Sequence, residues 1–175
     1  MSAPKITTFS ADDLVRHLPE LGALLRACVH DGASVGFVLP HSVAESEAFW
    51  SGKVLPSLRA GALVLFVARH GESIAGTVQL DYDTMPNQRH RAEVRKLLVH
   101  PAFRRQGIAK ALMAELERRA LQLQRSLLTL DTRTGDKAEP LYAALGYQTA
   151  GVIPQFCRDT QEERLDSTTI MYKAL

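Results

Sequence analysis

The stretch RKLLVHPAFRRQGIAKAL, residues 95–112, contains the pattern that decides the fold. The run Leu97–Val99 is apolar on both faces, as expected for a strand in the middle of a sheet. Pro101 cannot donate to a strand ladder, so this strand must end near His100. From Ile108 onwards, apolar residues recur at helical spacing. The stretch therefore predicts a central strand, a short basic loop and a helix.

The loop before this helix has the features of an anion-binding site. The first backbone amides of a helix have no internal partner, and the helix dipole is positive at that end. Gly107 has no side chain to obstruct an anion, and cationic side chains around it can add hydrogen bonds, namely Arg104, Arg105 and Lys110. From these residues alone, a basic cap on a surface helix remains the alternative. A Walker loop is excluded because Ala111 follows Lys110, and the glycine spacing of a Rossmann loop is not met.

Apolar spacing along the rest of the chain predicts the other elements. We expect strands at residues 5–9, 62–69, 74–80, 93–100, 127–131, 148–153 and 168–173, and helices at residues 14–28, 43–58, 108–123 and 137–145. This order predicts an α/β (α+β) fold, with a mixed, mostly antiparallel sheet of about seven strands flanked by about four helices. No linker or repeat divides the chain, so we expect a single domain over residues 1–175.

Composition narrows the classes of partner. The 21 basic and 19 acidic residues are spread along the chain, which argues against a nucleic-acid-binding arm. A local basic cluster is expected to be a solvated edge, since no aromatic residues interleave with its members, Arg89, His90, Arg91, Arg95 and Lys96. Cys28 and Cys157 show no metal-ligand spacing, and no apolar run could span a membrane. We therefore expect a cytoplasmic protein with small-molecule partners, no metal and no membrane association.

Two separated motifs resemble one enzyme family. The pattern Leu-x-Val-x-Pro followed by Arg-x-x-Gly-x-Ala, over residues 97–109, and the segment EPLYAALGYQTAGVIP, residues 139–154, resemble the GNAT superfamily of N-acetyltransferases. More narrowly, HDGASVGF, RAEVRKLLVHP, LTLDTRTG and LYAALGY are similar to segments of the acetyltransferases that confer tabtoxin resistance by acetylating an amino-acid-like β-lactam toxin. The resemblance implies acetyl-CoA as co-substrate and a role in antibiotic or toxin resistance.

The resemblance also implies a cofactor site. It places the pantetheine arm along the backbone of Leu97, Leu98 and Val99. It places the pyrophosphate on the loop and the first helical turn, comprising Arg104, Arg105, Gln106, Gly107, Ile108, Ala109 and Lys110. Ala109 stands where many relatives have glycine, and Gly135 stands where many have an asparagine that helps to bind the cofactor. That second departure puts cofactor contacts near residue 135 in doubt.

Acyl transfer to an alkyl amine needs acid and base groups, because an amine of pKa about 10.4 is only about one part in 2,500 unprotonated at pH 7. The family pattern makes Tyr142 the acid that protonates the departing thiolate; the alternative is a tyrosine packed on a helix face. The closer resemblance, which has a catalytic aspartate in the same LDT setting, makes Asp131 the first candidate for the base; an Asx turn or a helix-entry cap is its alternative role. Glu93 is the second candidate, unless it pairs with Arg91 or Arg95.

The acceptor is expected near the segment between the first two predicted helices, which covers the acceptor site in this family. Its candidate residues are His30, Asp31, Ser34 and Phe37, each of which could instead fix a turn or a helix end. We expect an acetyl-CoA-dependent N-acetyltransferase that acts on a small amine. Two alternatives stay open, a protein or peptide acceptor and a non-catalytic acyl-CoA sensor. The residues do not indicate an oligomeric state.

Overall fold

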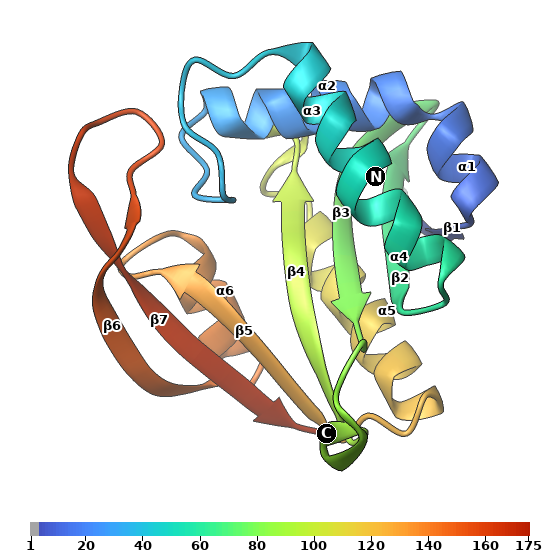
Figure 1. Cartoon of the computed structure of the whole chain (residues 1–175), viewed down its shortest axis with the longest axis vertical. Helices are drawn as coiled ribbons and strands as arrows, with labels where there is room; N and C mark the ends of the chain where they lie inside the picture. The colour runs from blue at the N-terminus through green and yellow to red at the C-terminus, as the bar shows by residue number, and fades with distance from the viewer. Residues whose placement is uncertain (1–3) are drawn as a thin grey trace.

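The strands form one mixed sheet in the computed structural model, which describes residues 4–175. The sheet has seven strands in the order β1-β2-β3-β4-β5-β7-β6 (Figure 1). Their bounds are β1 Lys5–Phe9, β2 Leu63–His70, β3 Ser73–Asp81, β4 Arg91–Val99, β5 Leu127–Arg133, β6 Gln148–Arg158 and β7 Leu165–Ala174. Only β4 and β5 pair in parallel, and the other neighbours are antiparallel. The predicted fold class is confirmed.

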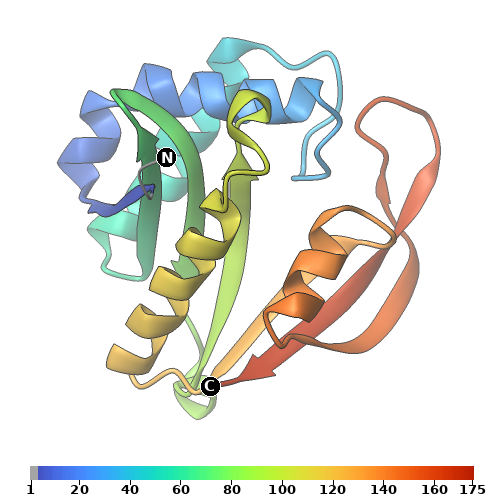
Figure 2. The ribbon, with the colours of Figure 1, turned by 180° about the vertical axis from the view of Figure 1, so that it is seen from behind.

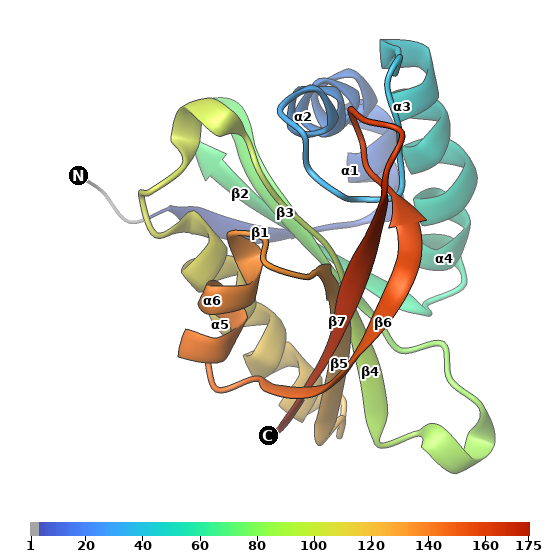
Figure 3. The same ribbon diagram turned by 90° about the vertical axis from the view of Figure 1, so that its left-hand side faces the viewer.

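The helices cover both faces of the sheet (Figure 3). One face carries α1 Ala11–Arg16, α2 Leu18–His30, α3 Val43–Phe49, a π-helical turn η1 Trp50–Val54 and α4 Leu55–Arg59. The opposite face carries α5 Ile108–Gln122 and α6 Ala138–Ala144, and this face is turned toward the viewer in Figure 2. Short 3-10 turns, η2 Pro86–Gln88 and η3 Pro101–Phe103, lie at the two ends of β4. None of the helices in the described residues is long and apolar enough to cross a membrane.

The expectation of a single first helix over residues 14–28 is wrong. Ser10 caps α1, because its hydroxyl accepts from the Asp13 amide at 3.1 Å. The chain then leaves the helical conformation at His17, where φ is −106°, and α2 starts again with Pro19 in its first turn. Leucine spacing alone could not reveal this break, since the apolar stripe continues across it.

The last hairpin is longer than the sequence predicts. We expected a strand to end at Ile153, since Pro154 follows, but β6 continues to Arg158. This strand lies at the edge of the sheet, where a proline costs no ladder hydrogen bond on the solvent side. The register with β7 shifts between Ile153 and Cys157, and Gln155 has a φ of +52°, so a bulge accommodates the extra residues.

The core is divided by the sheet into two layers. On one side, α5 buries the predicted stripe of Ile108, Leu112, Met113, Leu116 and Ala120. On the other side, α2 and the π-helical turn cover the alternate residues of β2. Gly76 on β3 lets this packing close, because a Cβ there would lie 2.6 Å from the Leu98 carbonyl oxygen. The glycine thus fixes how closely β3 approaches β4.

Candidate functional site

The sheet ladder opens between β4 and β5. These parallel strands pair only where Arg91–Glu93 faces Leu127–Thr129. Farther along, β4 runs toward α2 while β5 runs toward the β6–β7 hairpin, and the two ribbons diverge (Figure 1). On the side away from β3, the run Leu97–Val99 therefore has no strand partner among residues 4–175. We call the region between residues 94–99 of β4 and residues 130–133 of β5 the β4–β5 opening.

The loop before α5 keeps its first amides accessible. Gly107 is the N-cap of α5 in a left-handed conformation, with φ +78°, and no side chain caps the helix. A Cβ at this position would meet nothing within 4 Å. Because the helix N-terminus is open and the required backbone conformation favours glycine, an anion can approach these amides closely.

The predicted cofactor residues around Gly107 differ in their surroundings. Arg105 and Lys110 are exposed, and within residues 4–175 neither forms an ion pair. Gln106 is half-buried, Ala109 lies within the first turn, and Ile108 is buried in the core below α5. Two free cations therefore flank the open amides.

Arg104 points away from these amides. Its Nε donates to the Val99 carbonyl at 3.3 Å, and its guanidinium forms an ion pair with the Asp31 carboxylate. Asp31 also caps the end of α2 through its backbone amide. Arg104 thus links the end of β4 to the end of α2, a contact that the sequence did not reveal. Its predicted role in pyrophosphate binding stays a prediction.

Tyr142 on α6 is buried, with 6% of its surface exposed, and its ring packs edge-on against Tyr147 at 5.8 Å between centroids. Among the described residues, the hydroxyl of Tyr147 is fully enclosed and has no hydrogen-bond partner. The hydroxyl of Tyr142 does not share this condition. Burial raises the pKa of Tyr142 well above its usual value, and the carboxylates of Asp131 and Asp136 raise it further. The group is therefore a protonated donor at neutral pH.

The two carboxylates considered as bases have different partners. Asp131 is exposed in β5, paired with Ile170 of β7, and accepts one hydrogen bond from Thr168 at 3.3 Å. Its alternative role in an Asx turn is wrong, because it lies inside a strand. Glu93 is bound to the Arg95 guanidinium at 3.0 Å, as its alternative role predicted. Asp131 is the less engaged of the two carboxylates.

The segment over residues 31–42, here the roof loop, joins α2 to α3 above the β4–β5 opening. The predicted acceptor residues in and next to it are placed by local contacts. The His30 ring bonds the His41 carbonyl at 2.8 Å, and Ser34 Oγ lies 3.7 Å from Cys157 Sγ. Phe37 packs against Phe49, with 5.4 Å between ring centroids. His30 therefore fixes the loop, while Ser34 and Phe37 line its inner side.

The turn between β6 and β7 pins the roof loop. Leu39 donates its amide to the Thr160 carbonyl at 2.9 Å, and the Thr160 hydroxyl donates to the Ala33 carbonyl at 3.0 Å. Arg133 at the end of β5 donates to the Gly32 carbonyl at 3.2 Å and pairs with Asp159 at 2.9 Å. Segments more than a hundred residues apart thus meet over the opening, as Figure 1 shows.

Gly135 follows β5 in a left-handed conformation, with φ +77°. Its amide donates to the Glu139 carboxylate of α6 at 2.7 Å. Glycine and asparagine are the residues that tolerate this conformation best. The backbone geometry therefore explains why glycine can occupy the position where many relatives have asparagine.

The expectation of a solvated basic edge is wrong for Lys96. A bulge in β4, opposite Thr77–Gln79, gives Lys96 a φ of +49° and directs its side chain under the roof loop. Burial lowers the pKa of its ammonium. Lys96 and Arg133 are the site residues that the sequence analysis missed, because a bulge and a contact distant in sequence leave no mark on apolar periodicity.

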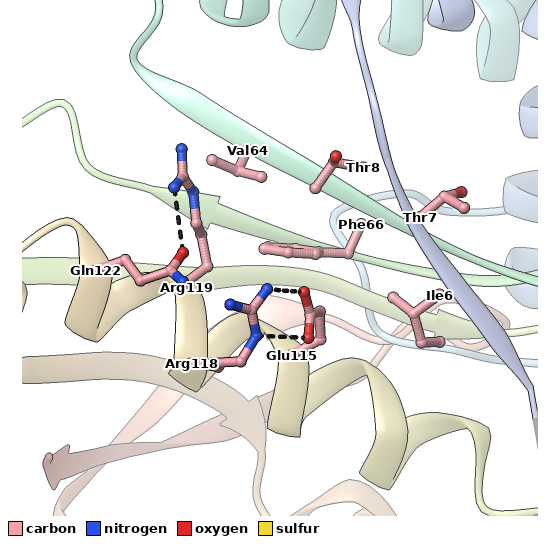
Figure 4. A pocket seen from close by; sticks show the side chains of 9 residues that line it. All are labelled: Ile6, Thr7, Thr8, Val64, Phe66, Glu115, Arg118, Arg119 and Gln122. Carbon is pink, nitrogen blue, oxygen red and sulfur yellow. Dashed lines mark hydrogen bonds and ion pairs between the residues drawn. The ribbon is translucent and has the colours of Figure 1, made fainter.

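One surface pocket lies elsewhere, between β1, β2 and α5 (Figure 4). Phe66 and Val64 line it from β2, and on the α5 side Arg118 pairs with Glu115 one turn away on the same helix. It contains none of the predicted site residues. Over residues 4–175, no group of three or more His, Cys, Asp or Glu side chains is arranged to hold a metal ion.

Comparison with known proteins identifies a matching family model and similar solved structures. Residues 13–147 match the model of the acetyltransferase (GNAT) family. Similar solved structures include a phosphinothricin acetyltransferase (Pat) from Sinorhizobium meliloti in complex with AcCoA, with 20% identity, a TM-score of 0.80, and coverage of 99% of this chain and 89% of that chain.

Two further structures are similar over nearly their full lengths. The ribosomal-protein-alanine N-acetyltransferase of Brucella melitensis has 20% identity and a TM-score of 0.77, covering 98% of this chain and 99% of that chain. The yncA protein of Salmonella typhimurium, solved with its cofactor acetyl-CoA, has 16% identity and a TM-score of 0.76, covering 99% of this chain and 95% of that chain. At these identities, the similarity establishes the fold.

Proposed function

The chain belongs to the acetyltransferase (GNAT) family, and we propose that it transfers the acetyl group of acetyl-CoA to the amine of a small, amino-acid-like molecule, such as a β-lactam toxin. The structures from Sinorhizobium meliloti and Salmonella typhimurium were solved with acetyl-CoA, which supports that co-substrate. The open amides at Gly107 suit its pyrophosphate, and Arg105 and Lys110 add positive charge. The edge of Leu97–Val99 that faces away from β3 suits its pantetheine arm.

The observation that carries the proposal is the arrangement of Asp131 and Tyr142 at the β4–β5 opening. Burial raises the pKa of Tyr142 and the charge of Asp131 raises it further, which supports a proposal that places both groups in one site. Asp131 takes a proton from the acceptor ammonium, directly or through water, and the freed amine attacks the acetyl carbonyl. The carbon–sulfur bond breaks, and Tyr142 donates its hydroxyl hydrogen to the departing sulfur. The second proton that the nitrogen loses in becoming an amide returns to the Tyr142 oxygen, directly or through water. Because burial disfavours a tyrosinate, Tyr142 starts each cycle protonated.

The roof loop favours a small acceptor over a protein chain. It is fixed at Gly32 and Ala33 and again at Leu39 by contacts with Arg133 and Thr160. A small amine can bind beneath this fixed loop and reach the exposed Asp131 without displacing these hydrogen bonds, which supports a small acceptor.

The test is release of free coenzyme A thiol from acetyl-CoA in the presence of amines. The panel includes amino acids, β-lactam amines and peptides with free N-termini. We expect release with small amines and little with peptides. Release with peptides alone would assign a protein acceptor. Tight acetyl-CoA binding without release from any amine would make the protein a sensor instead.

A further inference from the structure

Lys96 lies on the acceptor side of the β4–β5 opening. The bulge in β4 turns it toward the face that carries α1 to α4, and its Nζ lies 5.4 Å from the centroid of the Phe49 ring. A Cβ built on Gly36 of the roof loop would lie 3.7 Å from the same nitrogen. Its ammonium is thus enclosed between the roof loop and the end of α3. A residue other than glycine rarely has a positive φ, and such positions cluster at functional sites.

Within the described chain, the charge of Lys96 has the cation–π contact with Phe49 but no carboxylate partner, in contrast to that of its neighbour. Arg95 pairs with Asp81 and with Glu93, both at 3.0 Å. Within residues 4–175, no carboxylate oxygen lies within 4.0 Å of the Lys96 ammonium. Asp131 and Glu93 act on it only from farther away, and burial lowers its pKa despite them. A desolvated cation without a counter-ion is costly to fold, so its retention needs a compensating role.

Gln79 provides a second unpaired polar group on the same sheet face. It is only 3% exposed, and its amide nitrogen is enclosed without a hydrogen-bond partner in the described part of the chain. Gln79 is the register partner of Arg95, which directly precedes Lys96, and the β4 bulge begins beside it. Buried amides normally have partners, so this one indicates a missing acceptor of hydrogen bonds.

We infer that Lys96 and Gln79 form the subsite that binds a carboxylate of the acceptor. A carboxylate has oxygens for both the ammonium and the amide nitrogen, and it would neutralise the unpaired charge. The amine of the same acceptor then faces Asp131, the base of the proposed reaction. The site is thus positive on the Lys96 side and negative on the Asp131 side, which matches an amino acid in its zwitterionic form. This inference rests on the proposed function and specifies the acceptor class.

The test compares each amino acid of a panel with its carboxamide, which keeps the amine and removes the negative charge. Lys96→Met is the main variant, because methionine keeps the length of the side chain without its charge. Lys53→Met makes the same replacement at an exposed lysine away from the site and serves as the control. Gln79→Leu is the second variant. Thiol release gives kcat and KM, and calorimetry with the coenzyme A complex measures acceptor binding without turnover.

We expect Lys96→Met to lower kcat/KM for amino acids about 10- to 100-fold, mainly through a higher KM, since bonds to charged groups are the stronger ones. Carboxamide turnover, coenzyme A affinity and the Lys53→Met control should stay near wild type. The Tm of Lys96→Met should be equal or higher, because an unpaired buried charge is removed. A purely structural lysine would instead lower the Tm and affect both substrates equally.

The outcomes separate the inference from the proposed function. Turnover of carboxylates and carboxamides with equal efficiency overturns the inference and leaves the acetyltransferase proposal standing. If no amine is acetylated, the proposed reaction fails, and calorimetry decides the subsite. The subsite is supported if Lys96→Met and Gln79→Leu bind amino acids more weakly than the wild type does. It is overturned if the wild type binds no amino acid, or if both variants bind amino acids as the wild type does.

Discussion

The guanidinium of Arg104 forms an ion pair with the carboxylate of Asp31, which joins the loop before α5 to the end of α2. The same side chain donates to the Val99 carbonyl, the last residue of β4. A cation of the expected pyrophosphate site is therefore neutralised by a neighbouring carboxylate. The carboxylate that neutralises it begins the roof loop, so the cofactor side and the acceptor side of the site share one contact.

Asp31→Asn should strengthen acetyl-CoA binding about two- to fivefold, because it removes a negative charge beside the pyrophosphate site and frees Arg104. The stability should change by less than about 1 kcal/mol, since the pair is more than a third exposed. Isothermal calorimetry with acetyl-CoA at low and high salt measures the effect. Asp83→Asn, in the exposed loop after β3, is the control. Weaker binding in Asp31→Asn would show that the pair instead organises the site.

Gly107→Glu should abolish acetyl-CoA binding, because the new side chain occupies the open space at the α5 amides and repels the pyrophosphate. Gly61→Glu is a matched control, since that glycine also has a positive φ, +65°, with nothing within 4 Å. Both variants carry a similar backbone strain of about 1–2 kcal/mol, so the difference in cofactor affinity isolates the site. Unchanged affinity in Gly107→Glu would refute the loop assignment.

Much of the fold could be predicted because its signals are local. The apolar stripe of α5 follows from the spacing of residues three and four apart. The capping box at Ser42 is encoded in four consecutive residues, and in it the Glu45 carboxylate accepts from the Ser42 amide at 2.7 Å. The break at His17 and the extension of β6 past Pro154 could not be predicted in this way. Both depend on what packs against the segment, and in particular on whether a strand lies at the edge of the sheet.

Gly76→Ala should destabilise the protein by about 1–3 kcal/mol, the usual cost of overpacking. The added methyl would lie 2.6 Å from the Leu98 carbonyl oxygen, and that oxygen belongs to the backbone and cannot rotate away. Urea unfolding monitored by circular dichroism measures the change. Gly151→Ala, on the exposed edge strand with open space around it, should be close to neutral. Equal stabilities of the two variants would mean that β3 can move away from β4 at little cost.

Part of the candidate site could be predicted from the sequence, again because its signals lie in short, local motifs. Tyr142, Gly107 and the run Leu97–Val99 stand in short motifs, and in the structure Leu97 and Val99 pack against the core cluster that contains Tyr142. The sequence predicts a solvated Lys96 as part of the basic cluster, and strict alternation along β4 would turn its side chain to the face opposite that of Arg95. The bulge, which arises from pairing with a separate strand, reverses that direction. The contacts of Arg133 with the roof loop also arise only in the folded chain.

Tyr142→Phe should lower acetyl transfer about 10²- to 10⁴-fold, the usual range for loss of a general acid. Acetyl-CoA affinity should stay within about twofold, since only a hydroxyl is lost. Tyr172→Phe removes an exposed hydroxyl that bonds Gln148 at 3.0 Å, and it should leave turnover unchanged. Stopped-flow detection of the released thiol measures the rate. Turnover equal to wild type would remove Tyr142 from the chemistry.

The raised pKa of Tyr142 also predicts a pH effect on stability. Above about pH 10, tyrosine in the unfolded chain loses its proton, whereas Tyr142 in the folded chain keeps it. The folded state then binds more protons, so stability falls as the pH rises through this range. Tyr142→Phe should therefore lose less stability than wild type between pH 9 and about pH 11 in urea titrations. An identical decline in both proteins would contradict the burial of this hydroxyl.

The most direct test of the account is the single-turnover rate of acetyl transfer in Asp131→Asn, measured across pH beside Glu93→Gln with an amino acid that the wild type acetylates. Asparagine keeps the shape of the side chain and can still bond Thr168, so folding and acetyl-CoA affinity should be retained. The account predicts a rate at least about 100-fold below wild type for Asp131→Asn and a smaller loss for Glu93→Gln. A wild-type rate in Asp131→Asn at every pH would contradict it.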